Sequence, residues 1–259
     1  MDIKGSVAVV TGASSGIGRA TALALAKRGA HVVAAARREG RLRELESFIE
    51  DNGGEATPVA CDVTQPDDIR RLAAVVQEAF GRCDILVNNA GIPSGGSFTD
   101  LTYERIDEVV ATNLTSVLHA TKAFLPMMRR RGRGHVVNIS SIAGRHAVPG
   151  AAVYSATKHA VVAFSESMNH ETSPDGVLVT AICPAFVDTE GFPQKDLPDA
   201  IVMPMRTVTR AVVRTIEEGT TPQVTVPRWM GALEVFRVAT PGPYRWVVGK
   251  VLMPRRHDR

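Results

Sequence analysis

A tyrosine and a lysine four positions apart, Tyr154 and Lys158, are the residues of this chain whose types and spacing best suit acid–base chemistry. On a helix, positions i and i+4 share a face, so the two Cβ atoms would lie roughly 6 Å apart. An unperturbed phenol has a pKa of about 10 and exchanges few protons near neutral pH. A nearby ammonium favours the phenolate, so the spacing predicts that Lys158 lowers the pKa of Tyr154. The alternative is a chance pair on a solvated helix face.

A glycine-rich turn near the N-terminus predicts a phosphate-binding site. The apolar run Val7–Thr11 is typical of a buried strand, and Gly12, Gly16 and Gly18 follow it at the start of a helical pattern over residues 15–28. Glycines permit a tight turn, and the N-terminus of the helix offers unpaired N–H groups to a pyrophosphate. The spacing differs from G-x-G-x-x-G, and a glycine turn that binds no ligand is the alternative.

Five motifs occur in one order along the chain and together resemble the short-chain dehydrogenase/reductase family. The resemblance covers about residues 4–226 and implies an NAD(P)-dependent oxidoreductase. The motifs are Thr11-Gly-Ala-Ser-Ser-Gly-Ile-Gly18, Asn88-Asn-Ala-Gly91, Asn113, Ser141 and Tyr154-x-x-x-Lys158.

The resemblance implies a catalytic group of Asn113, Ser141, Tyr154 and Lys158. In this group a hydride passes between nicotinamide and a carbonyl carbon, Tyr154 gives the oxygen its proton, and Ser141 holds that oxygen. Lys158 is implied to hold the nicotinamide ribose and to keep the phenol acidic, and Asn113 to bind a water that resupplies the proton. Successive side chains on a strand point oppositely, so only one of Ser140 and Ser141 faces the site, and the resemblance selects Ser141.

Alternating strand and helix patterns predict a single doubly wound α/β Rossmann domain. Short buried strands separated by helices favour a seven-stranded, mostly parallel sheet with helices on both faces. We expect residues 1–226 to form the dinucleotide-binding catalytic domain and residues 227–259 a helical extension of the same domain. The predicted strands are residues 7–11, 31–35, 57–60, 85–88, 135–139, 178–182 and 223–226, and the predicted helices are residues 15–28, 40–52, 66–80, 103–131, 153–173 and 208–218.

The end of the second predicted strand favours NADP over NAD. Enzymes specific for NAD usually place an acidic residue there, and this chain has Arg37 and Arg38 instead. Arg37 offers a planar set of donors to a 2′-phosphate, which NAD lacks. The alternative is that both arginines only begin a solvated, arginine-rich helix.

The resemblance implies the remaining cofactor contacts. It puts Asp62 and Val63 at the adenine, Asn89 to Gly91 along the ribose and nicotinamide, and Thr189 at the carboxamide. The expected set is Gly12, Ser14, Ser15, Gly16, Ile17, Gly18, Arg37, Arg38, Asp62, Val63, Asn89, Ala90, Gly91, Tyr154, Lys158, Pro184, Val187 and Thr189.

One residue departs from the family pattern beside the nicotinamide. Ala185 follows Pro184 where the family usually has glycine. Alanine enters left-handed φ at a cost, so we expect this turn to be slightly reshaped without loss of cofactor binding.

The segment expected to cover the substrate is largely apolar. No arginine pair forms an obvious clamp for a charged group, so an apolar or lipid-like ketone, or its secondary alcohol, fits best. Packing of the same residues against one another is the alternative. They are Phe192, Pro193, Ile201, Val202, Met203 and Met205 in segment 190–207, and His146, Val148 and Pro149 after the catalytic serine.

The amino-acid composition limits the classes of binding partner. A net charge of +3 over 259 residues is too small to favour nucleic acid. Apolar stretches 229–236 and 244–253 of the tail alternate with arginines, which favours a lid or a homodimer or homotetramer interface, with peripheral membrane contact as the alternative.

The three cysteines, Cys61, Cys83 and Cys183, are far apart, which favours buried thiols over metal ligands, and no metal is expected. The N-terminus lacks the apolar core of a signal peptide, so we expect a cytoplasmic protein.

Two other functions use the same fold. A non-catalytic NADP-binding regulatory or interaction protein would not need Tyr154, Lys158 and Ser141 together, and all three are present. A dehydratase or epimerase usually has a longer chain with a sugar-nucleotide region, which this sequence does not contain.

Overall fold

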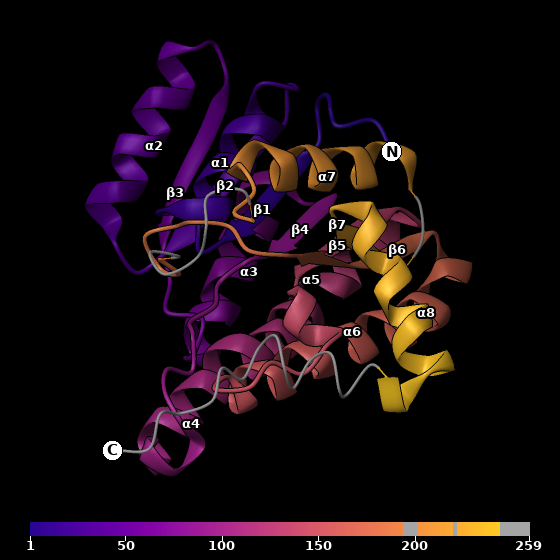
Figure 1. Cartoon of the computed structure of the whole chain (residues 1–259). Helices are drawn as coiled ribbons and strands as arrows, with labels where there is room; N and C mark the ends of the chain where they lie inside the picture. The colour runs from indigo at the N-terminus through magenta and orange to yellow at the C-terminus, as the bar shows by residue number, and fades with distance from the viewer. Residues whose placement is uncertain (194–200, 220–221, 244–259) are drawn as a thin grey trace.

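A parallel sheet forms the centre of the molecule in the computed structural model of the chain, which describes residues 1–193, 201–219 and 222–243 (Figure 1). Its seven strands have the order β3-β2-β1-β4-β5-β6-β7, and each pairing between neighbours is parallel. The predicted doubly wound α/β fold is confirmed, with a wholly parallel sheet in the described residues. The strands are β1 Val7–Thr11, β2 His31–Ala36, β3 Glu55–Ala60, β4 Ile85–Asn88, β5 Gly134–Ile139, β6 Val177–Pro184 and β7 Gln223–Val226.

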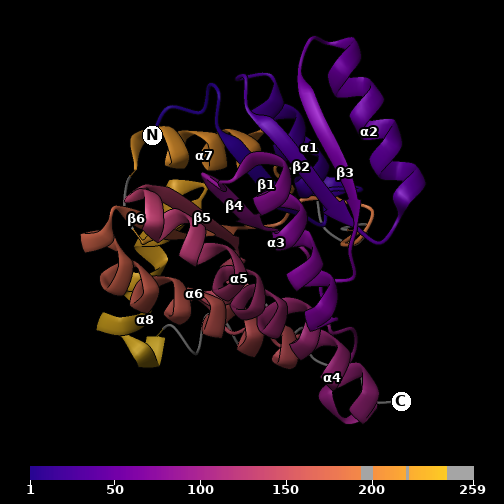
Figure 2. The same cartoon turned by 180° about the vertical axis from the view of Figure 1, so that it is seen from behind.

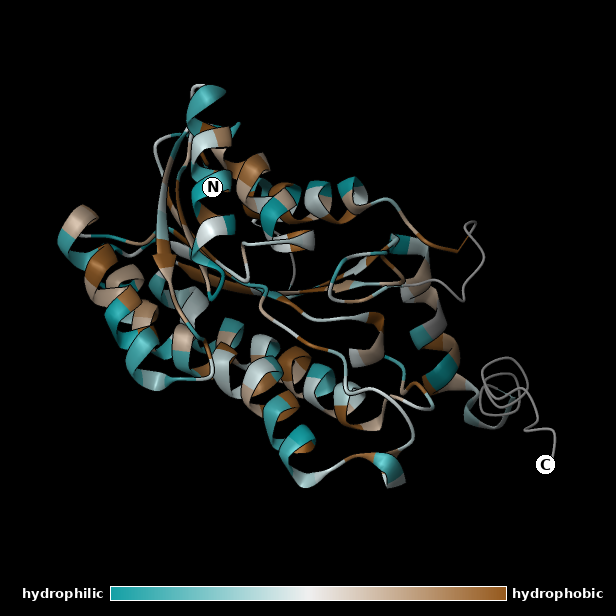
Figure 3. Ribbon diagram, turned by 90° about the vertical axis from the view of Figure 1, so that its left-hand side faces the viewer, coloured by the Kyte–Doolittle hydropathy of each residue, from teal (hydrophilic) through white to brown (hydrophobic). Residues whose placement is uncertain are grey.

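Helices cover both faces of this sheet (Figures 1 and 2). Helices α1, α2 and α7 pack on one face around a core that includes Leu25, Leu45 and Val212. Helices α3 and α5 pack on the other around Leu72 and Phe124. Figure 3 shows the hydrophobic strands between the two helix layers. The helices are α1 Gly16–Ala26, α2 Glu39–Asp51, α3 Pro66–Phe80, α4 Tyr103–Val110, α5 Ser116–Arg131, α6 Ala152–Thr172, α7 Met205–Glu218 and α8 Ala232–Ala239.

Local sequence signals explain where helix α3 begins and ends. Pro66 occupies its first turn, where a missing N–H costs nothing, and Asp67 and Asp68 lie at the positive end of the helix dipole. The helix stops at Gly81, whose φ of 64° is left-handed. These signals fix the short connection from α3 into β4. The Asn88-Asn-Ala-Gly91 motif begins at the carboxyl end of β4 and continues into the loop that follows.

The predicted helix over residues 103–131 is interrupted at the residue of functional interest. Between α4 and α5 the chain forms a π-helical turn, Ala111–Thr115, with Asn113 at its centre. A π turn adds a residue to the helix and is common at functional sites. The sequence predicted an unbroken α-helix, and the amide of Asn113, which bonds outside the helix, accounts for the difference.

The C-terminal part also differs in detail from the sequence-based expectation. Strand β6 runs two residues beyond the predicted end at 182, because Cys183 and Pro184 pair with Thr225 and Val226 of β7. A 3-10 turn, Arg228–Gly231, leads into α8. The second predicted tail stretch, residues 244–253, lies outside the described residues.

One buried histidine makes the stability of the sheet depend on pH. His135, the second residue of β5, has 1% of its surface exposed, and its Nε2 lies 2.9 Å from Thr180 Oγ1 on β6. Burial, followed by the positive N-terminal amino group, lowers the pKa of His135 from 6.5 to about 3. The folded protein therefore keeps this imidazole neutral where an unfolded chain would protonate it.

We predict that the free energy of unfolding falls as the pH drops below about 6.5. Unfolding then takes up a proton at residue 135, which lowers that free energy by up to about 1.4 kcal/mol per pH unit until the pH nears the folded pKa. Urea unfolding at pH 7.5, 6.0 and 5.0 measures the slope. His135→Gln retains a donor for Thr180 and should show a shallower slope, whereas equal slopes would contradict the assignment to this histidine.

Candidate active site

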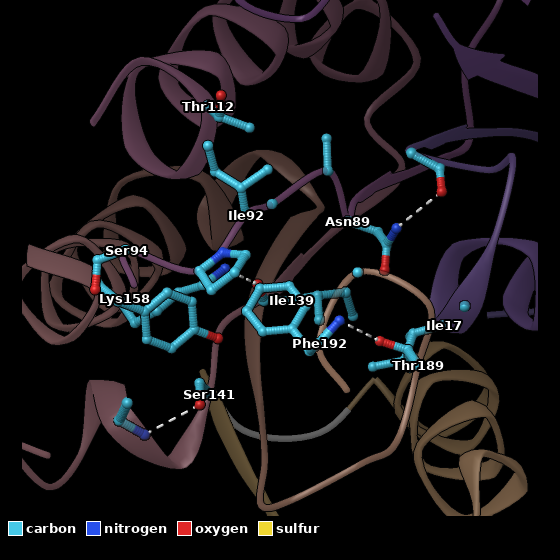
Figure 4. Close-up of a pocket in the computed structure, with 18 of the residues that line it drawn as sticks. Ile17, Asn89, Ile92, Ser94, Thr112, Ile139, Ser141, Lys158, Thr189 and Phe192 are labelled. Carbon is cyan, nitrogen blue, oxygen red and sulfur yellow. Dashed lines mark hydrogen bonds between the residues drawn. The ribbon is translucent and has the colours of Figure 1, made fainter. Parts of the chain in front are cut away.

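A groove of about 1170 Å³ lies over the carboxyl ends of the strands (Figure 4). Parallel sheets bind ligands at this edge, where the loops after successive strands meet. Every residue of the predicted site lines the groove except Gly18 and Asn113, which lie behind its wall. The fold thus brings the sequence motifs together, and their individual roles stay predictions.

The glycines of the first turn allow a backbone approach that no side chain would permit. Gly12 and Gly16 have φ values of 64° and 53°, in the left-handed region. A Cβ on Gly18 would lie 2.3 Å from the carbonyl oxygen of Gly12. The Asn89 amide closes the same corner by donating to the carbonyl oxygens of Thr11 and Gly12 at 3.1 and 3.3 Å. Asn89 therefore ties the end of β4 to the turn.

The N-terminus of α1 faces the groove with its N–H groups uncapped by a side chain. Ser15 occupies the N-cap position, but its hydroxyl makes no capping bond to the helix. That hydroxyl instead accepts a 2.8 Å hydrogen bond from Arg38 Nη2, and Ser14 Oγ accepts one of 3.1 Å from the same atom. Free N–H groups at a helix N-terminus favour anions, and phosphate binding at this turn stays a prediction.

Tyr154 and Lys158 lie on one face of α6 at the opposite end of the groove. Lys158 is 4% exposed, its Nζ donates to the Ile139 carbonyl oxygen at 2.9 Å, and Nζ lies 5.6 Å from the centre of the Tyr154 ring. Burial lowers the pKa of Lys158 to about 8. The ammonium thus faces the ring of the tyrosine.

Burial also controls the phenol, in the direction opposite to our expectation. It raises the pKa of Tyr154 to about 12, and the hydrogen bond with Ser141 opposes this rise only partly. The predicted net fall of the Tyr154 pKa is therefore wrong, because desolvation of the phenol outweighs the interactions that favour the phenolate.

The two serines after β5 make different hydrogen bonds, although both border the groove, and the prediction that only one of them faces the site stays a prediction. Ser140 is buried, and its hydroxyl donates to the Lys158 carbonyl oxygen at 2.9 Å, which clamps α6 to β5. Ser141 lines the groove and caps the following 3-10 turn, Ile142–Gly144, by accepting from the Ala143 N–H at 3.1 Å. Figure 4 shows Ser141 and Lys158 around the same space.

Asn113 is fully buried and clamps the loop that follows β4. Its Oδ1 accepts from the Ile92 N–H at 2.8 Å, and its Nδ2 donates to the Ile92 carbonyl oxygen at 2.9 Å. A Cβ on Gly91 would lie 3.4 Å from Asn113 Oδ1 and 3.5 Å from Lys158 Nζ, so these three residues meet at one point. The side chain is committed to backbone, and the predicted role in binding a relay water stays a prediction.

The charged end of the groove is organised by Arg38 rather than by Arg37. Arg37 lines the groove with an exposed side chain, and within the described residues it makes no hydrogen bond or ion pair. Arg38 bonds both serines of the glycine turn and pairs with Glu190. Arg41 pairs with the other oxygen of that carboxylate at 3.3 Å. The sequence did not single out Arg41 or Glu190, although the spacing of Arg38 and Arg41 puts both on one face of a helix start.

The other predicted cofactor residues line the groove between these two ends. Asp62 Oδ1 accepts hydrogen bonds from the Thr64 N–H at 3.0 Å and from the Thr64 hydroxyl at 2.8 Å. The side chain of Val63 packs into the core. The Ala185 N–H donates to the Val226 carbonyl oxygen at 2.8 Å, so this residue continues the sheet. Pro184, Val187 and Thr189 follow along the wall, as do Ile17, Ala90 and Gly91.

The end of the groove that was predicted to hold the substrate is more polar than predicted. Phe192, Pro193, Val148 and Pro149 line it as expected. Met203 and Met205 instead pack against the core, because the segment before α7 folds onto that helix layer. His146, Ile201 and Val202 also lie outside the lining. The sequence missed Ser94, Glu108 and Thr112, which line the groove from the loop after β4 and from the region of the π turn.

The tail contacts the turn that carries the serine. Arg145, just after the 3-10 turn, forms an ion pair with Glu234 of α8, and both side chains are largely buried. Trp229, Val235 and Val238 of the tail are exposed. The described part of the tail thus has one face fixed to the loop that follows Ser141 and one apolar face exposed.

The described residues contain no cluster of three or more histidine, cysteine or acidic side chains with metal-binding geometry. Across the same residues, no helix has the length and apolar character needed to cross a membrane. All three cysteines are buried free thiols, as the sequence predicted.

Comparison with known proteins gives one consistent family. The family model of short chain dehydrogenases matches residues 6–198. A provisionally named ketoacyl reductase of Streptomyces coelicolor is 45% identical over 185 residues, which cover 71% of each chain. The 3-oxoacyl-[acyl-carrier-protein] reductase of Vibrio cholerae is 37% identical over 213 residues, covering 82% of this chain and 84% of the relative.

Solved structures agree with the sequence comparison. A single-site variant of actinorhodin polyketide ketoreductase, solved with NADPH, has a TM-score of 0.80 and 36% identity over 86% of this chain and 95% of its own. A short-chain dehydrogenase/reductase from Burkholderia phymatum in complex with NAD has a TM-score of 0.84 and 27% identity, over 98% and 99%. The chain belongs to the short-chain dehydrogenase/reductase family and is an NAD(P)-dependent dehydrogenase/reductase.

Proposed function

We propose that the protein is an NADP-dependent oxidoreductase that transfers a hydride between nicotinamide and a carbonyl or secondary alcohol. One observation carries this proposal: Tyr154, Ser141 and Lys158 border the same groove as an uncapped helix N-terminus and Arg38. The first three residues suit proton transfer at an oxygen atom. The last two suit the pyrophosphate and the 2′-phosphate of NADP.

The residues present fit a dinucleotide. A Cβ on Gly12 would come within 2.9 Å of the Ala90 Cα, so only glycine lets the turn after β1 pack directly against the loop after β4. The groove volume of about 1170 Å³ exceeds the usual size of sites for one small molecule, about 300–1,000 Å³. This volume supports a groove that holds a cofactor together with a substrate.

The side chains of the site suit proton donation to a carbonyl oxygen. The bound nicotinamide supplies the hydride. Because the pKa of Tyr154 is raised, its phenol keeps the proton until an alkoxide develops nearby. The Ser141 hydroxyl offers the oxygen a second hydrogen bond. Lys158, with a pKa of about 8, carries a positive charge in most molecules at pH 7 and stabilises the phenolate left behind.

We assign an apolar or lipid-like ketone to the substrate end. Pro93, Val148 and Phe192 give that end apolar walls, while Ser94 and Thr112 add hydroxyls for polar groups of the substrate. One relative is named as a ketoacyl reductase and another as a 3-oxoacyl-[acyl-carrier-protein] reductase, and both names support a ketone and the reductive direction. A screen of NADPH consumption across ketone classes tests this assignment.

The second candidate is a non-catalytic NADP-binding regulatory or interaction protein. The exposed apolar face of the tail favours it, because such a face suits a partner. This candidate predicts cofactor binding without turnover of any ketone or alcohol, so the same screen separates the two functions.

Assembly and location complete the proposal. We expect a homodimer or homotetramer that acts on a small molecule, with residues 227–259 as a helical extension of the domain, and no nucleic-acid partner. The buried free thiols are consistent with a reducing compartment such as the cytoplasm.

Tyr154→Phe should bind cofactor normally and lose at least about a hundredfold in turnover, because the proton donor disappears while the ring and its packing remain. Steady-state kinetics and cofactor titration measure both quantities. Tyr103→Phe is the matched control, since Tyr103 is 84% exposed and lies outside the groove. Undiminished turnover of Tyr154→Phe would remove this residue from the chemistry.

Arg38→Gln should raise the dissociation constant of NADPH by about tenfold to a hundredfold and change that of NADH little. The reason is that only NADPH carries the 2′-phosphate that a guanidinium binds with charge-assisted hydrogen bonds. Arg37→Gln provides the comparison within the same turn and should have the smaller effect, because Arg37 has no anchoring contact among the described residues. A larger effect of Arg37→Gln would restore the assignment to Arg37, and equal effects would contradict the larger role of Arg38.

Removal of residues 228–259 should raise the Michaelis constant for bulky ketones and change the oligomeric mass. Loss of the Arg145–Glu234 ion pair should loosen the turn after Ser141 and so raise the Michaelis constant. Removal of the tail should also uncover apolar surface and so change the oligomeric mass. Light scattering and kinetics test this. If the tail binds membranes instead, the full chain should sediment with anionic vesicles in a salt-sensitive way, while the truncated chain keeps its mass and activity.

A further inference from the structure

The carboxylate of Glu190 occupies a two-arginine clamp at the charged end of the groove. Its Oε1 accepts a hydrogen bond from Arg38 Nη1, and its Oε2 lies 3.3 Å from Arg41 Nη1. Arg38 is itself held by Ser14 and Ser15, at 3.1 and 2.8 Å. The two arginines begin α2, whereas Glu190 comes from the segment after β6, so residues about 150 positions apart meet here.

The two arginines hold the carboxylate of Glu190 in the way that they would hold a phosphate monoester. Each carboxylate oxygen has its own guanidinium partner, as oxygens of a phosphate do when two arginines bind it. The hydrogen bond from Arg38, with the positive charges of Arg38 and Arg41, lowers the pKa of Glu190 below its usual value, so the acid is ionised at neutral pH. A second anion at the same guanidinium groups would meet a like charge within a few ångströms.

Glu190 belongs to a tight turn that reaches both ends of the groove. Thr189 and Phe192 bridge this turn through backbone hydrogen bonds of 3.1 and 3.4 Å. A Cβ on Gly16 would lie 3.3 Å from Thr189 Cβ, so the turn touches the phosphate-binding glycines. The Phe192 ring centre lies 5.6 Å from that of Tyr154. Figure 4 shows Thr189 beside Ile17, with Phe192 next in the groove.

We infer that Glu190 is a determinant of cofactor selectivity that competes with the 2′-phosphate of NADP for Arg38 and Arg41. This inference rests on the proposed NADP site. No acid stands at the end of β2, and the nearby Glu39 pairs with Arg43, so Glu190 supplies the counter-charge of Arg38 and Arg41 from across the groove. The carboxylate thereby weakens NADPH binding relative to NADH.

A purely structural ion pair would explain the contacts differently. The three side chains are between 43% and 50% exposed, and ion pairs with that exposure contribute little to stability. The two explanations differ in what removal of the charge does. A structural pair predicts equal effects on both cofactors, whereas competition predicts a gain for NADPH alone.

The test compares Glu190→Gln with a matched control, Glu39→Gln. Glu39 is another exposed acid of the same region, paired with Arg43 at 2.6 Å and outside the groove. Fluorescence titration gives dissociation constants for NADPH and NADH. We expect Glu190→Gln to tighten NADPH binding by about fivefold to twentyfold and to leave NADH within about twofold, while Glu39→Gln changes neither.

Comparison of Arg38→Gln with the double variant Arg38→Gln/Glu190→Gln distinguishes an error in the role of Glu190 from an error in the NADP site. If the gain from Glu190→Gln shrinks in the Arg38→Gln background, the carboxylate acts through this arginine, as inferred. If Arg38→Gln weakens NADPH but Glu190→Gln fails to tighten it, or alters both cofactors equally, the inference is overturned and the NADP site stands. If Arg38→Gln leaves the ratio of the two dissociation constants unchanged, the NADP site itself is wrong.

Discussion

The contact between Gly18 and the carbonyl of Gly12 is the constraint on which the rest of the site depends. A Cβ at position 18 would lie 2.3 Å from that oxygen and 2.4 Å from Asn89 Nδ2, so only a hydrogen atom fits. Because α1 starts this close to the end of β1, its N-terminus faces the edge of the sheet. The Asn89 amide ties the end of β4 to the same turn. Three elements thus meet at one point, and the groove is the space above it.

A second set of polar contacts holds the catalytic end at a fixed position relative to that point. Asn138 of β5 accepts from Asn88 of β4 at 2.8 Å and donates to Ser165 of α6 at 2.9 Å. Ser140 and Ile139 bind α6 again through the Lys158 carbonyl and ammonium groups. Buried polar groups are costly unless they are satisfied, and these satisfy one another while they fix α6 against the sheet. The same burial raises the pKa of Tyr154 and lowers that of Lys158, so position and acidity have one physical cause.

Features that depend on local sequence were predictable, and those that depend on distant contacts were not. Apolar runs such as Val7–Thr11 predicted the strands because a strand buried on both faces must be apolar along its length. Motif order placed Ser141, Tyr154 and Lys158 at one edge of the sheet. The π turn at Asn113 depends on contacts with the loop after β4. The direction of the Tyr154 pKa shift depends on desolvation in the folded protein. The inward packing of Met203 and Met205 depends on the position of α7. None of these has a local signal.

Cofactor selectivity illustrates the same division most clearly. The usual rule assigns it from the residue at the end of β2, which assumes that the charge there is local. In this fold Arg38 and Arg41 share their clamp with Glu190, so the clamp has one net positive charge instead of two. Attraction of a doubly charged 2′-phosphate depends on that net charge and on the cost of displacing the carboxylate. The loop that carries the acid also covers Tyr154 through Phe192, so the proposed phosphate site and the proposed proton donor both border one short turn. A substitution in that turn therefore acts on both ends of the groove at once.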